Sequence, residues 1–166
     1  MNIRSLTVGA ALPLDEADRA TLISRLGEFA GTGKASLEAA GFTVQTTRLS
    51  TQPLEEWVEP GESALSTVAA LGEAVGRAGI DYCSLGTIQA AERSDDEAAL
   101  GLQDALAEML LKVPNCFGSI QVGVRREGGE GAVNLEAVRA SAWVIRALAD
   151  GSALGHCRAA LGAAFV

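Results

Sequence analysis

The stretch GIDYCSLGTI, residues 79–88, decides the fold of this chain. Gly79 is typical of the residue that ends a helix, and the run that follows it has the composition of a buried strand. Before it, apolar residues recur at three- and four-residue steps over residues 62–78, which predicts a helix. After it, Ser94 and Glu97 form a capping-box pattern that predicts the start of another helix. The stretch is therefore a strand between two helices.

The same alternation extends in both directions along the chain. The other predicted strands cover residues 3–9, 42–50, 116–124 and 158–166, and the other predicted helices are opened by Asp15 and Asn134. Helices of this length between strands act as crossovers, and they favour parallel strand pairing. We expect an α/β fold in which alternating β-α units form a mainly parallel sheet with helices packed outside it.

The segment GEFAGTGKAS, residues 27–36, resembles a phosphate-binding loop but departs from that motif. Gly33-Lys34 is followed by Ala35, where the motif needs Ser or Thr, and Gly27 stands one residue too far back. Apolar residues instead continue a helical period through the segment, at Leu22, Leu26, Phe29/Ala30 and Gly33. The same period predicts that the last helix buries Val138, Ala142, Ile145 and Leu148/Ala149.

Composition predicts one soluble, globular domain of 166 residues. Hydrophobic residues make up 48% of the chain and charged residues 20%. A net charge of -8 argues against nucleic acid as a partner, because such binding needs a basic surface. No run approaches the roughly 18 apolar residues of a membrane helix, and the N-terminus lacks the pattern of a signal peptide. We expect a cytoplasmic protein without a membrane partner.

The cysteines indicate neither a disulfide framework nor a metal site. Cys83, Cys116 and Cys157 are odd in number and widely spaced, and the single histidine, His156, adjoins Cys157. Adjacent residues on a strand point to opposite faces, so this pair makes a poor catalytic dyad. We expect reduced, mostly buried thiols, no metal and no cofactor.

Five polar residues in or just after the predicted strands are the candidate ligand-binding residues. They are Arg4, Arg48, Ser50, Gln52 and Asp81. A buried charge must be paired or must face a solvent-filled site, so two interpretations remain open. Arg48 and Asp81 could form a structural salt bridge, or the arginines could hold a carboxylate or phosphate at the strand ends. No catalytic residue is predicted.

Four segments carry a resemblance to a known family. They are NIRSLTVG (2–9), TTRLSTQPLEEW (46–57), GIDYCSLGTI (79–88) and NCFGSIQVG (115–123). Together they resemble the N-terminal part of the domain of unknown function 711 family, also called uncharacterised protein family 0210. The family is similar to the barrels of pyruvate formate-lyase and ribonucleotide reductase, which have ten strands in two five-stranded halves. The resemblance implies that residues 1–166 form a single α/β domain amounting to half of such a barrel.

The resemblance transfers no reaction, and it leaves two hypotheses. Members of the family are more than twice as long, so this chain would be a fragment or a short relative that completes its sheet with another copy. Cys83 and Cys116 fall within strands, so neither inherits a radical role. The first hypothesis is a half-barrel without catalytic apparatus, which self-associates or pairs with a missing C-terminal half. The second is a small-molecule enzyme or binder for an anionic ligand.

Overall fold

The computed structural model describes residues 1–91, 97–125, 131–152 and 162–165. The strands are β1 (Asn2–Gly9), β2 (Thr43–Ser50), β3 (Tyr82–Ile88), β4 (Cys116–Arg125), β5 (Gly131–Val133) and β6 (Gly162–Phe165). The helices are α1 (Glu16–Ala39), the short 3-10 helix η1 (Leu54–Glu56), α2 (Glu62–Arg77), α3 (Glu97–Lys112) and α4 (Leu135–Gly151).

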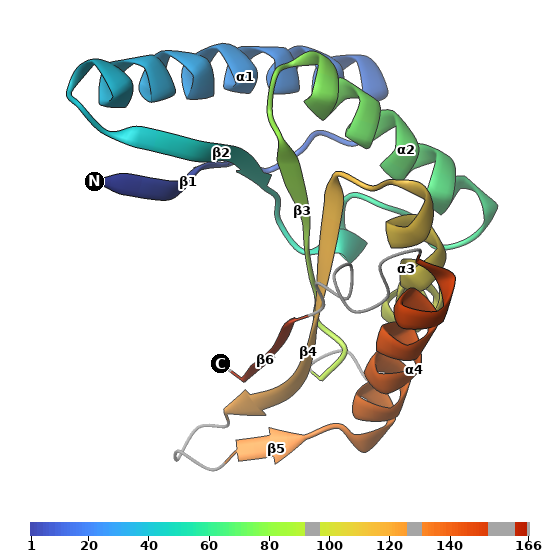
Figure 1. Ribbon diagram of the computed structural model, residues 1–166. Coiled ribbons are helices and arrows are strands. Elements are labelled where there is room, and N and C mark those ends of the chain that lie inside the picture. The colour runs from blue at the N-terminus through green and yellow to red at the C-terminus, as the bar shows by residue number, and fades with distance from the viewer. Residues whose placement is uncertain (92–96, 126–130, 153–161, 166) are drawn as a thin grey trace.

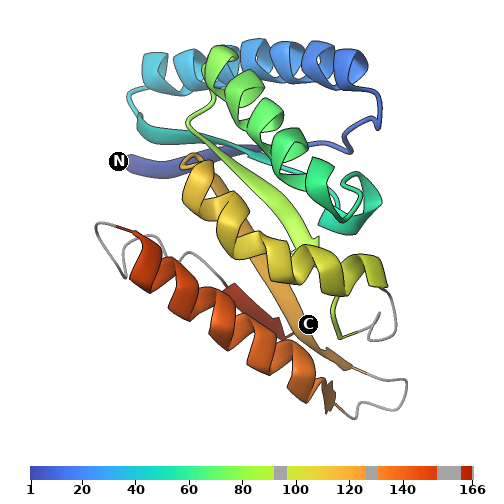
Figure 2. The same ribbon diagram turned by 90° about the vertical axis from the view of Figure 1, so that its right-hand side faces the viewer.

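The strands form one curled, mainly parallel sheet, as predicted. Strands β1, β2, β3 and β4 pair in that order and in parallel, and β6 also pairs with β4 in parallel. Helices α1 to α4 cover the convex face in chain order, and the opposite face is concave (Figures 1 and 2). The expected half-barrel is confirmed. The antiparallel strand β5, which pairs with the end of β4, is not among the predicted strands.

The predicted capping residues of α1 and α4 form hydrogen bonds at the helix N-termini. The Asp15 carboxylate accepts a hydrogen bond from the Asp18 N–H at 2.9 Å, and it caps α1. The Asn134 side chain accepts from the N–H groups of Glu136 and Ala137 at the start of α4. The predicted Ser94 cap of α3 lies outside the described residues.

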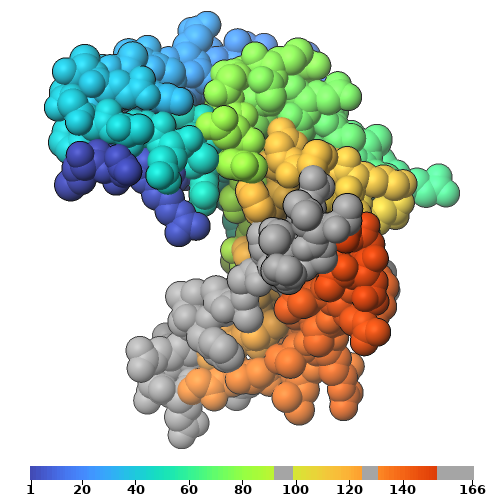
Figure 3. Space-filling view, in the orientation of Figure 1, coloured from blue at the N-terminus to red at the C-terminus, as the bar shows by residue number. Residues whose placement is uncertain are grey.

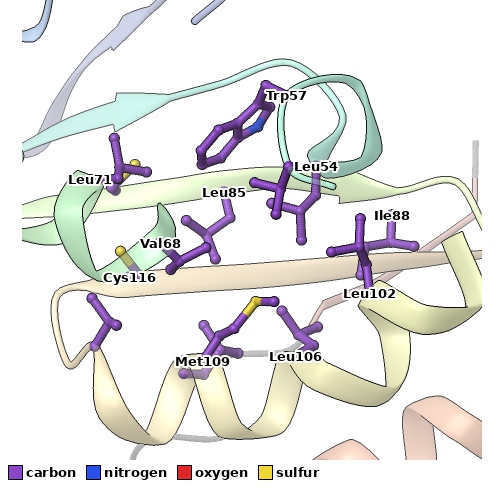
Figure 4. Close-up of a cluster of buried hydrophobic side chains, with 14 of the residues drawn as sticks. Leu54, Trp57, Val68, Leu71, Leu85, Ile88, Leu102, Leu106, Met109 and Cys116 are labelled. Carbon is purple, nitrogen blue, oxygen red and sulfur yellow. The ribbon is translucent and has the colours of Figure 1, made fainter. Parts of the chain in front are cut away.

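The core lies between the sheet and the helices and is mostly aliphatic. Leu49, Leu85 and Ile120 project from three neighbouring strands and are fully buried. Side chains from α2 and α3 meet this face of the sheet, Leu54 of η1 joins them, and so does Trp57, the residue that follows η1 (Figure 4). One continuous layer of mostly aliphatic side chains therefore holds the helices onto the strands.

Helix α1 buries a face centred about one residue away from the predicted one. The buried residues are Arg19, Ile23, Gly27 and Ala30, whereas Phe29 is 70% exposed. The cause is a close approach at Gly27, where any side chain would collide with the carbonyl of Ala78 at the end of α2. Gly27, which does not fit the phosphate-loop motif, therefore serves to let α1 and α2 pack closely.

Helix α4 corrects a second prediction. Its buried residues are Ala137, Ser141, Val144 and Leu148, so only Leu148 was predicted correctly. Val138 and Ile145, which were expected to face inward, are 39% and 42% exposed, and Ala142 is exposed as well. The helix carries two apolar stripes, and periodicity alone cannot say which one faces the sheet.

Gly27 and Gly31, one helical turn apart, test the packing of α1. Gly27→Ala should destabilise the protein by about 1–3 kcal/mol, because its methyl group would collide with the backbone of Ala78. Gly31→Ala is the control: nothing lies within 4 Å of its added carbon, so better helix propensity should stabilise by about 0.5–1 kcal/mol. Urea unfolding measures both, and equal effects would contradict the close contact.

A candidate anion site on the concave face of the sheet

The concave face contains a hollow of about 720 Å³, formed by side chains of β1, β2, β3 and β4. Figure 3 shows the molecule hollowed on this side. Side chains alternate along a strand, so the neighbours of the core residues point away from the helices. Leu49 and Leu85 enter the core, while Arg48, Ser50 and Ser84 line the hollow. The packing that builds the core therefore also builds this surface.

Hydroxyl groups dominate the uncharged polar lining of the hollow. They belong to Thr7, Thr46, Ser50, Ser84 and Ser119, which come from four neighbouring strands. The Ser119 hydroxyl is joined to that of Thr87 at 2.8 Å. A hydroxyl can donate or accept a hydrogen bond, so this surface can contact the oxygen atoms of a ligand.

Both charged residues in the described lining are arginines. Arg4 is exposed, and Arg48 is half-buried. The Nε of Arg48 is buried and, among the described residues, has no hydrogen-bond partner. No Asp or Glu occurs in the described lining, although the chain as a whole carries a net charge of -8. The hollow is therefore locally positive on an acidic protein.

Two aromatic side chains contribute apolar surface to the hollow. The ring centroids of Tyr82 on β3 and Phe117 on β4 lie 5.2 Å apart, and the rings are tilted by 54°. The Arg48 guanidinium carbon lies 5.9 Å from the Tyr82 centroid, which is the range of a cation–π contact. Arginine, tyrosine and phenylalanine thus form a row across three strands.

Three of the five candidate residues lie together in the structure, and the other two make contacts elsewhere. Arg4, Arg48 and Ser50 line the hollow, whereas Gln52 and Asp81 do not. The Gln52 amide accepts from Leu12 N–H at 2.9 Å and donates to Leu12 C=O at 3.0 Å. It therefore fixes the loop after β1 to the loop after β2.

Asp81 does not form the salt bridge with Arg48 that was one of the two interpretations. Its Oδ2 instead accepts from the Thr47 N–H at 2.8 Å and from the Thr47 hydroxyl at 3.0 Å. That hydroxyl also accepts from the Asp81 N–H at 3.2 Å. Thr47 is buried on the core side of β2, whereas Arg48, the next residue, faces the hollow. Alternation along the strand separates the two charges.

Sequence reasoning missed most of the uncharged lining. Thr7, Tyr82, Ser84, Phe117 and Ser119 all lie on strands, opposite residues that enter the core. The signal was present as polar or aromatic residues at every second position of the runs YCS and FGS. Such residues suit a solvated strand face equally well, so only the curvature of the sheet identifies them as a lining.

Two cysteines sit side by side beneath the sheet, as reduced and buried thiols. Cys83 on β3 and Cys116 on β4 are register partners. The hydrogen bond with the Cys116 thiol, together with burial, raises the pKa of Cys83. This confirms the prediction of buried thiols for these two residues, whereas Cys157 and His156 lie outside the described residues.

The described residues offer neither a metal-binding cluster nor a membrane-spanning helix. No group of three or more His, Cys, Asp or Glu side chains in the described ranges lies close enough to hold a metal ion. None of the helices there combines the length and apolarity that crossing a membrane requires.

Comparison with known proteins places the chain in a family of uncharacterised proteins. The family model described as Uncharacterised ACR (DUF711) matches residues 1–165. No curated protein matches the sequence. The match covers every strand that contributes to the hollow.

Double-mutant cycles test the partner of Asp81. Asp81→Ala and Thr47→Val should show a coupling energy of about 1–3 kcal/mol, because they share hydrogen bonds. Asp81→Ala and Arg48→Met should be additive to within about 0.5 kcal/mol. Urea unfolding of the single and double variants gives both values. A strong coupling energy between Asp81 and Arg48 would contradict this assignment and would support the salt bridge between these two residues.

The raised pKa of Cys83 predicts a loss of stability at alkaline pH. An unfolded thiol ionises above pH of about 8.5, while the buried thiol stays protonated, so the free energy of unfolding should fall as pH rises beyond that value. Cys83→Ala should make this fall in the free energy of unfolding shallower.

Alkylation tests the burial of the two thiols. In a Cys157→Ser background, Cys83 and Cys116 of the folded protein should resist alkylation at pH 8, and they should react once the protein is unfolded. Rapid alkylation of the folded protein would contradict their burial.

Proposed function

This chain belongs to the uncharacterised family DUF711, and we propose that its half-barrel binds a small anionic molecule, a carboxylate or a phosphate, on the concave face. The observation that carries the proposal is the charge of the hollow: two arginines and no carboxylate in its described lining, on a chain of net charge -8. Such a surface attracts anions that the rest of the protein repels.

Arg48 is the central residue of the proposed site. Its guanidinium is half-buried, its Nε lacks a hydrogen-bond partner among the described residues, and the Tyr82 ring holds one side of it. A carboxylate or phosphate could accept two parallel N–H bonds from this group, and such bonds are about twice as strong as neutral ones. Arg4 would add charge at the rim, and Ser50 would add a hydroxyl donor.

The proposal is one of binding, and it assigns no reaction. The described lining contains no Cys, His, Asp or Glu that could serve as a nucleophile or a general base beside the ligand. We propose that the protein acts in the cytoplasm without nucleic acid, because the chain is acidic and Cys83 and Cys116 are reduced. Kinship with the pyruvate formate-lyase barrels stays a prediction.

A second candidate function is that of a half-barrel module completed by another polypeptide. Among the described strands, β1 pairs with β2 alone, so its outer edge carries free backbone groups. Another copy of the chain, or the remaining half of a barrel, could supply the missing strand. This function and anion binding are compatible, because the hollow lies on the inner face of the sheet.

Ligand-induced thermal stabilisation tests the anion site. Inorganic phosphate, nucleotides and dicarboxylates are screened, and a ligand at about 100 times its dissociation constant should stabilise the protein by roughly 2.7 kcal/mol. Arg48→Met should abolish the response, and Arg4→Met should weaken it. Arg146→Met is the control, because Arg146 pairs with Asp150 on the exposed surface of α4. An unchanged response in Arg48→Met would overturn the proposed site, as would the absence of any shift with any anion.

A further inference from the structure

The strand register orders the side chains that line the hollow into rows. Thr7 on β1 pairs with Arg48 on β2, and Arg48 pairs with Tyr82 on β3, so these three side chains form one row across the sheet. Side chains two residues further along the strands point to the same face. They form the next row, which contains Ser50, Ser84 and Phe117. Both rows therefore lead from a hydroxyl group to an aromatic ring.

The charged residues and the aromatic residues of the lining lie on different strands. Arg4 and Arg48 belong to β1 and β2, whereas Tyr82 and Phe117 belong to β3 and β4. Neighbouring strands lie about 4.8 Å apart, so roughly 10 Å separate β2 from β4. An ion of the size of acetate or inorganic phosphate, held by Arg48, would not reach Phe117. The hollow of about 720 Å³ instead has the size of sites that take larger organic ligands, about 300–1,000 Å³.

The two aromatic rings favour a flat, apolar ligand group above them. Tyr82 and Phe117 are half-buried, and both contribute surface to the hollow. Their rings are tilted by 54° rather than stacked, so neither ring covers the other. A third ring can join such a pair in the offset or edge-to-face arrangements that aromatic groups prefer. A small inorganic anion would leave this apolar surface in water, whereas an aromatic ring would cover it.

We infer that the ligand of this hollow joins its anionic group to an aromatic ring. This ligand class rests on the proposed anion site and narrows it. Arg48 would bind the carboxylate or phosphate, with the Thr7 hydroxyl beside it. The ligand ring would lie against Tyr82 and Phe117, and the Ser84 hydroxyl would contact polar atoms between the two ends. Aromatic carboxylates and nucleoside monophosphates share this chemistry.

Matched pairs of anions, compared by isothermal titration calorimetry, test the ligand class. Benzoate is compared with acetate, and adenosine monophosphate with ribose 5-phosphate, because each pair keeps the anionic group and differs in the ring. In at least one pair the ring-bearing anion should bind about tenfold more tightly or better. The pair that shows the difference decides between carboxylate and phosphate. Cyclohexanecarboxylate, which is apolar but not aromatic, should bind less tightly than benzoate if the carboxylate pair shows it.

Substitution of Phe117 locates the ring of the ligand. Phe117→Leu keeps an apolar side chain and removes the aromatic face, so it should reduce the advantage of the ring-bearing anion about tenfold. The ring beside Arg48 is that of Tyr82, so Phe117→Leu should leave the affinity for the ring-less anion unchanged. Phe29→Leu is the matched control, because Phe29 is 70% exposed on α1 and does not line the hollow. Circular dichroism checks that both variants fold.

Tyr82 reports on the contact directly, because it is the only tyrosine of the chain. In protein labelled with ¹³C-tyrosine, the signals of this one ring are followed by nuclear magnetic resonance. A saturating ring-bearing anion should move them further than its saturating ring-less counterpart, since a second ring would lie against Tyr82. Arg48→Met should remove both responses.

The outcomes separate the ligand class from the anion site itself. If ring-bearing and ring-less anions bind equally in both pairs, or if Phe117→Leu leaves the difference between them intact, the aromatic ligand is wrong while the anion site stands. Equal binding of benzoate and cyclohexanecarboxylate, with no difference in the phosphate pair, would also overturn the aromatic ligand. If no anion binds, or if Arg48→Met leaves binding unchanged, the anion site is wrong and its ligand class falls with it.

Discussion

The alternation of side chains along four adjacent parallel strands is the constraint on which the rest of the structure depends. Each strand sends one set of side chains into the aliphatic core and the other to the concave face. Leu49 and Leu85 are held by the helices, and this fixes Arg48 and Ser84 on the opposite side. The candidate site is thus a direct consequence of core packing, and a shift of register by one residue would exchange the two faces.

The core of this protein depends on close helix approach, because the chain is poor in aromatic residues. At Gly27 the backbone of α2 comes so near to α1 that no side chain fits between them. In β3, Gly86 has a φ of +83° at a bulge, and its α-carbon faces the Gln52–Pro53 backbone. The same Gln52 holds Leu12 with two hydrogen bonds. These contacts position the loops that follow β1 and β2.

Charge is distributed unevenly between the two faces of the sheet. The described ion pairs, such as Arg139–Glu136 and Lys112–Glu108, lie on exposed helix surfaces, where each contributes little stability. The concave face instead presents Arg4 and Arg48 without a carboxylate in its described lining. The exterior is acidic, whereas both charged residues in the described lining of the hollow are arginines, so the two surfaces differ in electrostatic potential.

The sequence by itself determined the order of the helices and of strands β1 to β4, the parallel pairing of these four strands and the caps at Asp15 and Asn134, because these depend on local composition and short-range hydrogen bonds. It did not predict the antiparallel strand β5. Only the tertiary structure decided which apolar stripe of α1 and of α4 faces the sheet. Apolar residues on two sides of a helix both recur at helical spacing, so the spacing alone does not say which side is buried. The tertiary structure likewise decided that Asp81 bonds to Thr47 rather than to Arg48. Opposite charges in a sequence suggest a pair, but adjacent strand residues face opposite sides of a sheet, and the fold alone sets which of them Asp81 can reach.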